Sequence, residues 1–401
     1  MSFSYAVLII AWWPLGIGFG VPTPLADPVL WHVHELLFGF ALAAAGGYGL
    51  TALSGWTGTA PLRGVWLKSL AMSWLAARGA ILASNGLPLA GLILINAAFG
   101  LLLAVILFRA WRVGPFRPRR KAPVFLALAI LGSVAGQTAF LIAARSGHPD
   151  IALAVGRAGV LAFAGLIIAI GGRAIPAFIG NWLRSVGDGR RHVIDRPRAR
   201  ILALGLVGMA LLGTTLDLRN PGFDRLIGAT LLGAALSLVW AIIGWRPVVA
   251  CRNPLLAGLV LGFLWVPIGL LAVAAHWIWP GVIPLGDAVH TLSIGAMAGL
   301  IMAIAGRASA RRVDGALVAG RGFTCGIGLI WLATVSRLAV AFFPAFGSEL
   351  VHGAAGLWCL GWLVFLVGFA PSVLGPAIRP VLSGARHPAD PSDPLGGGQP
   401  E

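Results

Sequence analysis

Long apolar runs dominate the chain, and short segments rich in arginine, glycine and proline separate them. A membrane-spanning helix needs about 20 mostly apolar residues, and most of these runs reach that length. Their apolar positions are continuous rather than alternating, which excludes a closed membrane barrel. The pattern therefore predicts an all-α polytopic membrane protein with about twelve transmembrane helices. The expected spans are 3–20, 30–54, 64–84, 88–109, 123–144, 151–172, 200–216, 226–245, 254–279, 285–307, 316–343 and 349–370.

Composition agrees with this prediction and excludes other classes of protein. Hydrophobic residues make up 58% of the 401 residues and charged residues only 10%, whereas a soluble domain carries about 25% charged residues. A disordered chain is excluded as well, because it requires low hydrophobicity. We expect one twelve-helix domain over residues 1–382, followed by a disordered tail over residues 383–401 that is rich in proline, glycine and aspartate.

The distribution of charge predicts how the spans are oriented. Most of the 29 lysines and arginines fall in the even-numbered loops and the C-terminal tail, and only Arg145, Arg219 and Arg225 fall in odd-numbered loops. Because basic loops remain in the cytoplasm, we expect both termini there. The net charge of +16 then belongs to these loops, and the expected partner is the lipid bilayer, with no nucleic acid. No lysine or arginine precedes Arg63, so we expect the first span to be retained rather than cleaved.

Ionisable residues gather at the outer ends of the predicted spans. An ionisable group inside a span is costly, and it therefore indicates function, although a single arginine can also extend to the headgroups. Several such residues in one layer favour a binding site. The layer contains five histidines, His32, His34, His276, His290 and His352, and three arginines, Arg78, Arg157 and Arg337.

The second span begins with a segment that could supply metal ligands in either of two backbone conformations, helical or extended. Asp27 and the proline after it predict a helix start. On a helix His32 and His34 point about 200° apart, so one metal is not bound by both, and His32 instead shares a face with Glu35. Glu35 would then accept a hydrogen bond from a ligating imidazole. If the segment is extended, His32 and His34 lie on one side and could chelate copper.

Imidazole suits haem iron and copper, and arginine pairs with carboxylates such as the haem propionates. The layer is therefore compatible with a b-type haem near the outer surface, with copper, or with an anion pocket lined by arginine. Small residues also recur every four positions on two spans, which predicts close helix packing. They are Gly39, Ala43 and Gly47 on the second span and Gly295 and Gly299 on the tenth.

Several ordered motifs resemble those of the NnrS family of bacterial membrane proteins. Residues 31–39 read WHVHELLFG and are similar to the family's W-H-A-H-E-M-L-F-G. Residues 172–178 read GRAIPAF, similar to G-R-V-I-P-x-F, and residues 290–297 read HTLSIGAM, similar to H-A-L-T-V-G-A-I. Further likenesses are Trp56-Thr57-Gly58, Arg78 after Trp74-Leu75, Asn181 and Arg337.

The resemblance implies a multi-pass protein of the bacterial inner membrane that carries haem and copper and is linked to nitric oxide and nitrosative stress. It implies no established turnover, so whether the chain is an enzyme stays open. Residues 305–312 lack a histidine that the family usually carries there, which indicates a divergent member. Either one centre is lost, or His276 and His352 supply replacement ligands. The motifs carry over His32, His34, Glu35, Arg78, Arg157, Arg173, His290 and Arg337 as cofactor-site candidates.

Two other functions compete with a haem- or copper-binding protein that responds to nitric oxide. One is a cofactor-free transporter of a small anion with an outer vestibule lined by arginine. No carboxylate lies in the middle of a predicted span, which weakens a proton-coupled transporter. The other is a subunit of a terminal oxidase or nitric oxide reductase. Such subunits place six histidines deep in the bundle, including an adjacent pair, and no His-His occurs here.

Overall fold

Helices form nearly all of the described chain. The computed structural model describes residues 1–20, 23–114, 121–187, 192–215, 221–313 and 316–374. The predicted domain end at 382 and the predicted tail at 383–401 lie outside these residues. The helices are α1 (Ser2–Gly18), α2 (Pro28–His34), α3 (Leu42–Thr57), α4 (Val65–Leu82), α5 (Leu89–Val113), α6 (Ala122–Arg145), α7 (Pro149–Ser185), α8 (Pro197–Thr215), α9 (Pro221–Ile243), α10 (Pro247–Ala250), α11 (Pro254–Ile278), α12 (Leu285–His290), α13 (Gly299–Ala308), α14 (Arg321–Ala339) and α15 (Gly347–Leu374).

Two of the spans contain a π-helical segment. The segment η2 (Glu35–Ala41) joins α2 to α3, and η3 (Thr291–Ala298) joins α12 to α13, so each set forms one continuous helix. Short 3-10 turns η1 (Pro24–Ala26) and η4 (Pro344–Phe346) precede α2 and α15. The strands β1 (Arg311–Val313) and β2 (Ala316–Val318) form one antiparallel hairpin.

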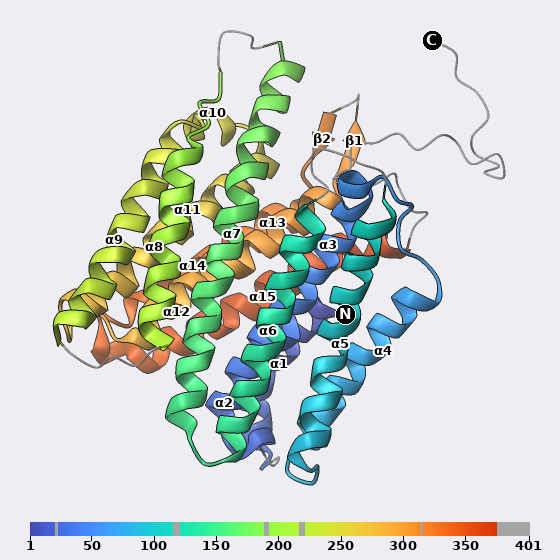
Figure 1. Cartoon of the computed structure of the whole chain (residues 1–401). Coiled ribbons are helices and arrows are strands. Elements are labelled where there is room, and N and C mark those ends of the chain that lie inside the picture. The colour runs from blue at the N-terminus through green and yellow to red at the C-terminus, as the bar shows by residue number, and fades with distance from the viewer. Residues whose placement is uncertain (21–22, 115–120, 188–191, 216–220, 314–315, 375–401) are drawn as a thin grey trace.

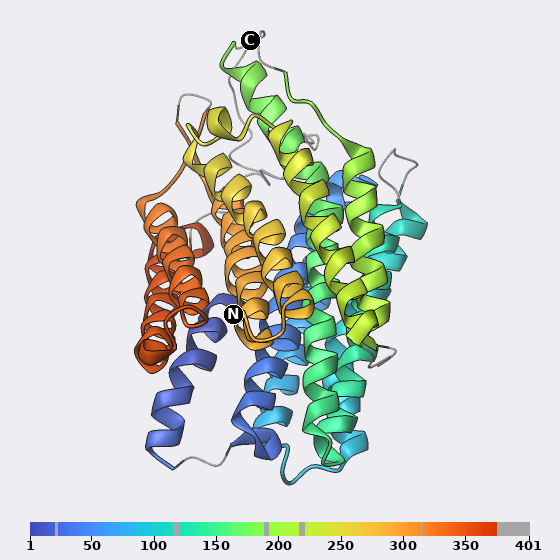
Figure 2. The ribbon, with the colours of Figure 1, turned by 90° about the vertical axis from the view of Figure 1, so that its left-hand side faces the viewer.

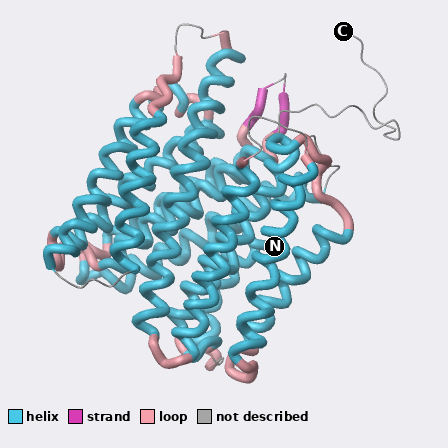
Figure 3. The backbone as a smooth tube through the Cα atoms, in the orientation of Figure 1, coloured by secondary structure: helices cyan, strands magenta, loops and turns pink. Residues whose placement is uncertain are grey.

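The prediction of an all-α polytopic membrane protein is confirmed. Among the described residues, ten helical stretches are long and apolar enough to cross a membrane. The helices α1 and α4 correspond to the other two predicted spans, 3–20 and 64–84. Figure 3 shows that helix forms almost the whole backbone, with the two strands at one end.

Two predicted boundaries were wrong. The span predicted over 151–172 continues as α7 to Ser185, through Pro176, because transmembrane helices tolerate proline where neighbouring groups restore the lost hydrogen bond. The span predicted from residue 316 begins instead at Arg321, because residues 316–318 pair with β1 as a strand.

The helices run up and down between two ends of the bundle. The hairpin and α10 lie at one end and α2 at the other (Figure 1). The pairs α8 and α9, α9 and α11, α5 and α6, and α14 and α15 pack side by side. Figure 2 shows α14 and α15 together on one flank. Basic residues lie at the end with the hairpin: Arg246 and Arg252 flank α10, and Arg311 and Arg312 belong to β1.

An aromatic cluster joins α1 and α15, the first and last of the described helices. Trp362 on α15 stacks on Phe3 of α1 with ring centroids 5.3 Å apart, and its ring also meets Phe40 of η2 at 5.3 Å. The indole nitrogen of Trp358 donates to the carbonyl oxygen of Ala6 at 2.9 Å. These contacts close the bundle between its first and last helices, where lipid alone gives no hydrophobic driving force for association.

Replacement of Trp362 by alanine tests this closure. Trp362 is fully buried, so its loss leaves a cavity and should lower the free energy of unfolding by about 3 kcal/mol. Thermal unfolding of the purified protein in detergent measures the effect. The matched control is Leu363→Ala, because Leu363 is 48% exposed on the same helix. Equal melting temperatures for the two variants would contradict this role of Trp362.

Candidate functional site

The second span begins as a helix at its Asp-Pro pair, as predicted. The side chain of Asp27 accepts hydrogen bonds from the backbone nitrogens of Val29 at 2.7 Å and Leu30 at 3.0 Å. Because α2 is helical from Pro28, the extended alternative for His32 and His34 does not occur. The two imidazoles lie on different sides of the helix and enter two separate groups of residues.

The first group surrounds the carboxylate of Glu35. It accepts hydrogen bonds from the hydroxyl of Tyr5 on α1 and from the guanidinium of Arg78 on α4. It also contacts the Nδ1 atom of His34 at 2.7 Å. Glu35 and His34 are fully buried, and Arg78 is 6% exposed. A buried carboxylate is stable only when it is paired and hydrogen-bonded, and here three side chains meet that need.

Two amide side chains extend this group across the bundle. The Nη2 atom of Arg78 donates to Oδ1 of Asn96 on α5 at 3.3 Å. The amide nitrogen of Gln137 on α6 lies 3.2 Å from Nε2 of His34 and 3.4 Å from Oδ1 of Asn96. Both ring nitrogens of His34 are therefore engaged by protein groups. We call this set the Glu35 cluster: Tyr5, His34, Glu35, Arg78, Asn96 and Gln137.

Glycine at position 39 makes room for the ion pair. A Cβ atom there would lie 2.6 Å from Nη1 of Arg78 and 3.2 Å from Oε2 of Glu35. The carbonyl oxygen of Gly39 also accepts a hydrogen bond from the indole of Trp74 at 2.8 Å. The close approach of a neighbouring helix that was predicted for this stripe therefore occurs at Gly39, where side chains of α4 lie against the backbone. It does not occur at Gly47, where a Cβ atom would meet nothing within 4 Å.

Close packing is confirmed on the tenth span. A Cβ atom at Gly295 would lie 2.7 Å from the ring of Trp265 on α11. A Cβ atom at Gly299 would lie 3.2 Å from the indole nitrogen of Trp331 on α14. Both glycines allow neighbouring helices to approach, as small residues do in membrane bundles.

The second group pairs His32 with His290, and we call it the His32–His290 pair. The ring centroids lie 6.2 Å apart, with the ring planes inclined by 30°. Nδ1 of His32 is buried and has no hydrogen-bond partner among the described residues. Nδ1 of His290 lies 2.6 Å from the carbonyl oxygen of Gly286, which leaves its Nε2 for another partner. Trp13 of α1 packs its ring edge-on against His32.

An ion pair lies beside the two rings. Arg337 of α14 donates to the carboxylate of Asp287 on α12. Arg337 is close enough to interact electrostatically with both His32 and His290. The expected contact between Glu35 and His32 is absent from the described hydrogen bonds, because Glu35 binds His34 instead. His32, His290 and Arg337 therefore bring α2, α12 and α14 together at this point.

The remaining candidates lie outside both groups. Arg157 and Arg173 are exposed on α7, and His352 is exposed on α15 with its Nδ1 2.7 Å from the carbonyl oxygen of Ser348. Nδ1 of His276 lies 2.9 Å from the carbonyl oxygen of Ile283. Within the described parts of the chain, no three His, Cys, Asp or Glu residues form a group that could hold a metal ion.

Sequence reasoning missed the neutral members of the Glu35 cluster. Asn96 and Gln137 are 3% and 2% exposed and lie in the middle of apolar helices. An amide inside a span seeks a partner on another helix, and that signal could have singled them out. Tyr5 gave no comparable signal, because tyrosine is common where membrane helices meet the interface.

Comparisons with known proteins give one match. The family model described as NnrS protein matches residues 1–376. No curated protein and no solved structure matches the chain. The matched range contains every residue of the Glu35 cluster and of the His32–His290 pair.

Removal of the Arg78 side chain tests the Glu35 cluster. Arg78→Ala would leave the carboxylate of Glu35 buried without its cationic partner, which should destabilise the protein by about 3–5 kcal/mol. Thermal unfolding in detergent measures this loss. Arg157→Ala is the matched control, because Arg157 is exposed and its loss should cost less than about 0.5 kcal/mol.

A second variant separates charge from packing. Glu35→Gln combined with Arg78→Ala removes the unpaired charge, so the double variant should be more stable than Arg78→Ala alone. If the double variant is the less stable of the two, buried charge does not explain the loss.

Proposed function

Because the chain belongs to the NnrS protein family, we propose that it is a haem- or copper-binding protein of the bacterial inner membrane that acts in the response to nitric oxide. The His32–His290 pair holds the metal in the outer half of the bundle. The Glu35 cluster holds the helix that carries His32. Nitric oxide or another small ligand of the metal is the expected partner.

The separation of the two imidazoles is the observation that carries this proposal. A bond from metal to imidazole nitrogen is about 2 Å long, so two rings that share one ion have centres roughly 5–6 Å apart, depending on the angle at the ion. The ring centroids of His32 and His290 are separated by 6.2 Å. The unsatisfied Nδ1 of His32 and the backbone bond at Nδ1 of His290 fit the same arrangement.

Haem iron and copper both accept two imidazoles, and the arginines affect the choice between them. Arginine was predicted to bind haem propionates, but Arg78 pairs with Glu35 and Arg337 with Asp287. A propionate at either arginine would compete with a protein carboxylate. This observation favours copper at the pair over haem with arginine-bound propionates. A bound metal would supply redox chemistry and a coordination site for a small ligand.

The other histidines predicted as metal ligands differ in which of their ring nitrogens already contact protein groups. His34 would have to leave Glu35 or Gln137 before it could bind a metal. His276 and His352 each keep Nε2 available while Nδ1 contacts a backbone oxygen, so their role as replacement ligands stays a prediction. Arg157 stays a prediction as well, and its exposed side chain places it outside both groups.

The anion-transport alternative has less support. It requires outer arginines that are available to an anion, whereas Arg78 and Arg337 already contact carboxylates. A transported anion would have to displace Glu35 or Asp287 from its partner. Arg157 is the one of the three outer candidates whose side chain is exposed.

Absorption spectra of histidine variants test the metal proposal. We expect the purified wild type to contain haem or copper, with a spectrum that shifts on addition of nitric oxide. His32→Ala and His290→Ala should each lose or shift this signal, because each removes one of two ligands. His352→Ala is the control and should keep it, since His352 lies outside the pair. Metal analysis of the same samples distinguishes copper from haem iron.

Two results would contradict the proposal. One is a wild type that stays colourless and free of metal after haem and copper supplementation, which would turn attention to anion transport. The other is a pair of variants, His32→Ala and His290→Ala, that retain the wild-type metal content and spectrum.

The basic loops support cytoplasmic termini. A reporter enzyme that is active only outside the cytoplasm, fused after Leu382, should be silent, because the basic loops at that end are retained inside. The same reporter inserted in the 146–148 loop, at the opposite end of the bundle, should be active. Activity after Leu382 would overturn the orientation.

A further inference from the structure

A cavity of about 470 Å³ lies between α3, α7, η3 and α13 and extends to α1 and α15. Its lining includes Arg307, Ser309 and Ala310, which directly precede β1 of the hairpin, and it contains neither a residue of α2 nor His290. Cavities that bind small molecules in proteins commonly measure about 300–1,000 Å³. Neither the Glu35 cluster nor the metal proposal uses this space.

Small side chains on α3 leave the cavity open. Residues 43–47 read Ala-Ala-Ala-Gly-Gly, and Ala43, Ala44, Ala45 and Gly47 all line the space. A Cβ atom at Gly47 would meet nothing within 4 Å, so no neighbouring helix fills the position. Close packing of helices therefore does not explain glycine at this position. The absence of a side chain at Gly47 instead keeps the cavity open there.

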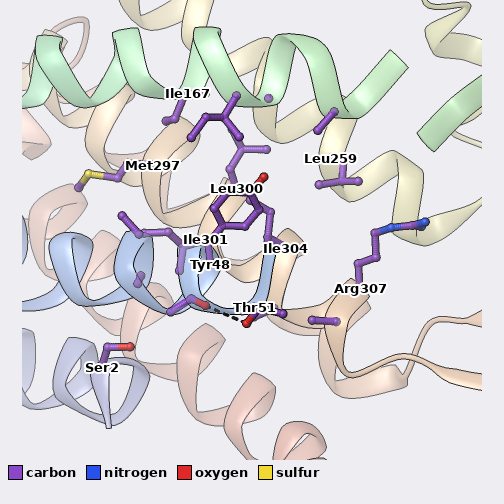
Figure 4. A pocket seen from close by; sticks show the side chains of 18 of the residues that line it. Ser2, Tyr48, Thr51, Ile167, Leu259, Met297, Leu300, Ile301, Ile304 and Arg307 are labelled. Atoms are coloured by element: carbon purple, nitrogen blue, oxygen red, sulfur yellow. Dashed lines mark hydrogen bonds between the residues drawn. The ribbon is translucent and has the colours of Figure 1, made fainter. Parts of the chain in front are cut away.

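The cavity is amphipathic along its length. Figure 4 shows Met297 at one end and Arg307 at the other, with Leu300, Ile301 and Ile304 between them. The guanidinium carbon of Arg307 lies 4.3 Å from the centre of the Phe178 ring, which holds the charge at that end. Arg307 is the one charged side chain in the described lining, which also contains the hydroxyl residues Ser2, Tyr48, Thr51, Ser309 and Ser372.

The chemistry of the lining identifies the kind of ligand. An apolar wall inside a membrane-spanning bundle accepts a hydrocarbon chain, and a cation at one end accepts an anionic head through charge-assisted hydrogen bonds. We propose that this cavity binds an acyl chain with an anionic head, the chain lying along residues 43–47 and the head beside Arg307. The ligand would come from the membrane leaflet on the side of the hairpin. This proposal stands independently of the metal site.

Saturable binding of radiolabelled palmitate to the delipidated full-length protein tests the proposal, with counts in empty micelles subtracted. Gly47→Leu should abolish saturable binding, because leucine fills the cavity without a clash at its Cβ atom. The matched control is Gly132→Leu on α6, where a Cβ atom also meets nothing and which does not line the cavity. That control should bind as the wild type does, and melting temperatures show that both variants are folded.

Charge at the head is tested separately. Arg307→Gln should weaken palmitate binding about tenfold, the typical effect of one charge-assisted hydrogen bond. It should leave the binding of hexadecanol, a neutral chain of equal length, unchanged. Arg321→Gln is the control, because Arg321 is exposed at the same end and outside the lining.

Competition identifies the source of the head. Displacement of palmitate by phosphatidylglycerol, but not by phosphatidylcholine, indicates an anionic phospholipid. Displacement by fatty acids alone indicates a free carboxylate. Either result supports the proposal. Non-saturable binding, wild-type binding by Gly47→Leu, or equal loss of palmitate and hexadecanol in Arg307→Gln would overturn it.

Discussion

A carboxylate buried among membrane helices is stable only with a cation and hydrogen-bond donors around it. Glu35 is fully buried, and its oxygens contact side chains from α1, α2 and α4. The second layer of the cluster adds α5 and α6. The first half of the bundle is therefore arranged around one negative charge. Gly39 follows from the same constraint, because a side chain there would occupy the place of the guanidinium.

His32 and His34 are two residues apart, and they belong to different groups of side chains. His34 belongs to the cluster that holds α2 in place, and its ring has no free nitrogen. His32 faces the second half of the bundle, where α12 and α14 bring His290 and Arg337 beside it. The two halves of the molecule thus meet at one short helix. The Glu35 cluster fixes α2 on one side of that helix, and this sets the direction in which the ring of His32 points toward His290 on the other side.

The fold could be predicted from the sequence because long apolar runs and basic loops are strong signals in membrane proteins. The helical phase of residues 28–35 was also sufficient to separate His32 from His34. Contacts between distant spans could not be predicted, because hydropathy does not say which helices are neighbours. Glu35 was therefore assigned to the wrong histidine, and Arg337 and Asp287 were not recognised as partners. Asn96 and Gln137 were not predicted as members of the site, because the search for site residues followed ionisable side chains and amides are neutral.

Both π-helical segments begin at the residue after a histidine, at Glu35 and at Thr291. A turn of π-helix contains more residues than a turn of α-helix, because its hydrogen bonds join residues five apart instead of four apart. A π-helical segment therefore rotates the helix before it relative to the helix after it. In each span the short first helix that carries the imidazole is thereby set at an angle independent of the long helix that follows. Loss or gain of a single residue in such a segment would turn the imidazole away while leaving the long helix unchanged. Length changes in these two segments are thus a route by which related chains could gain or lose a binding site without altering their fold.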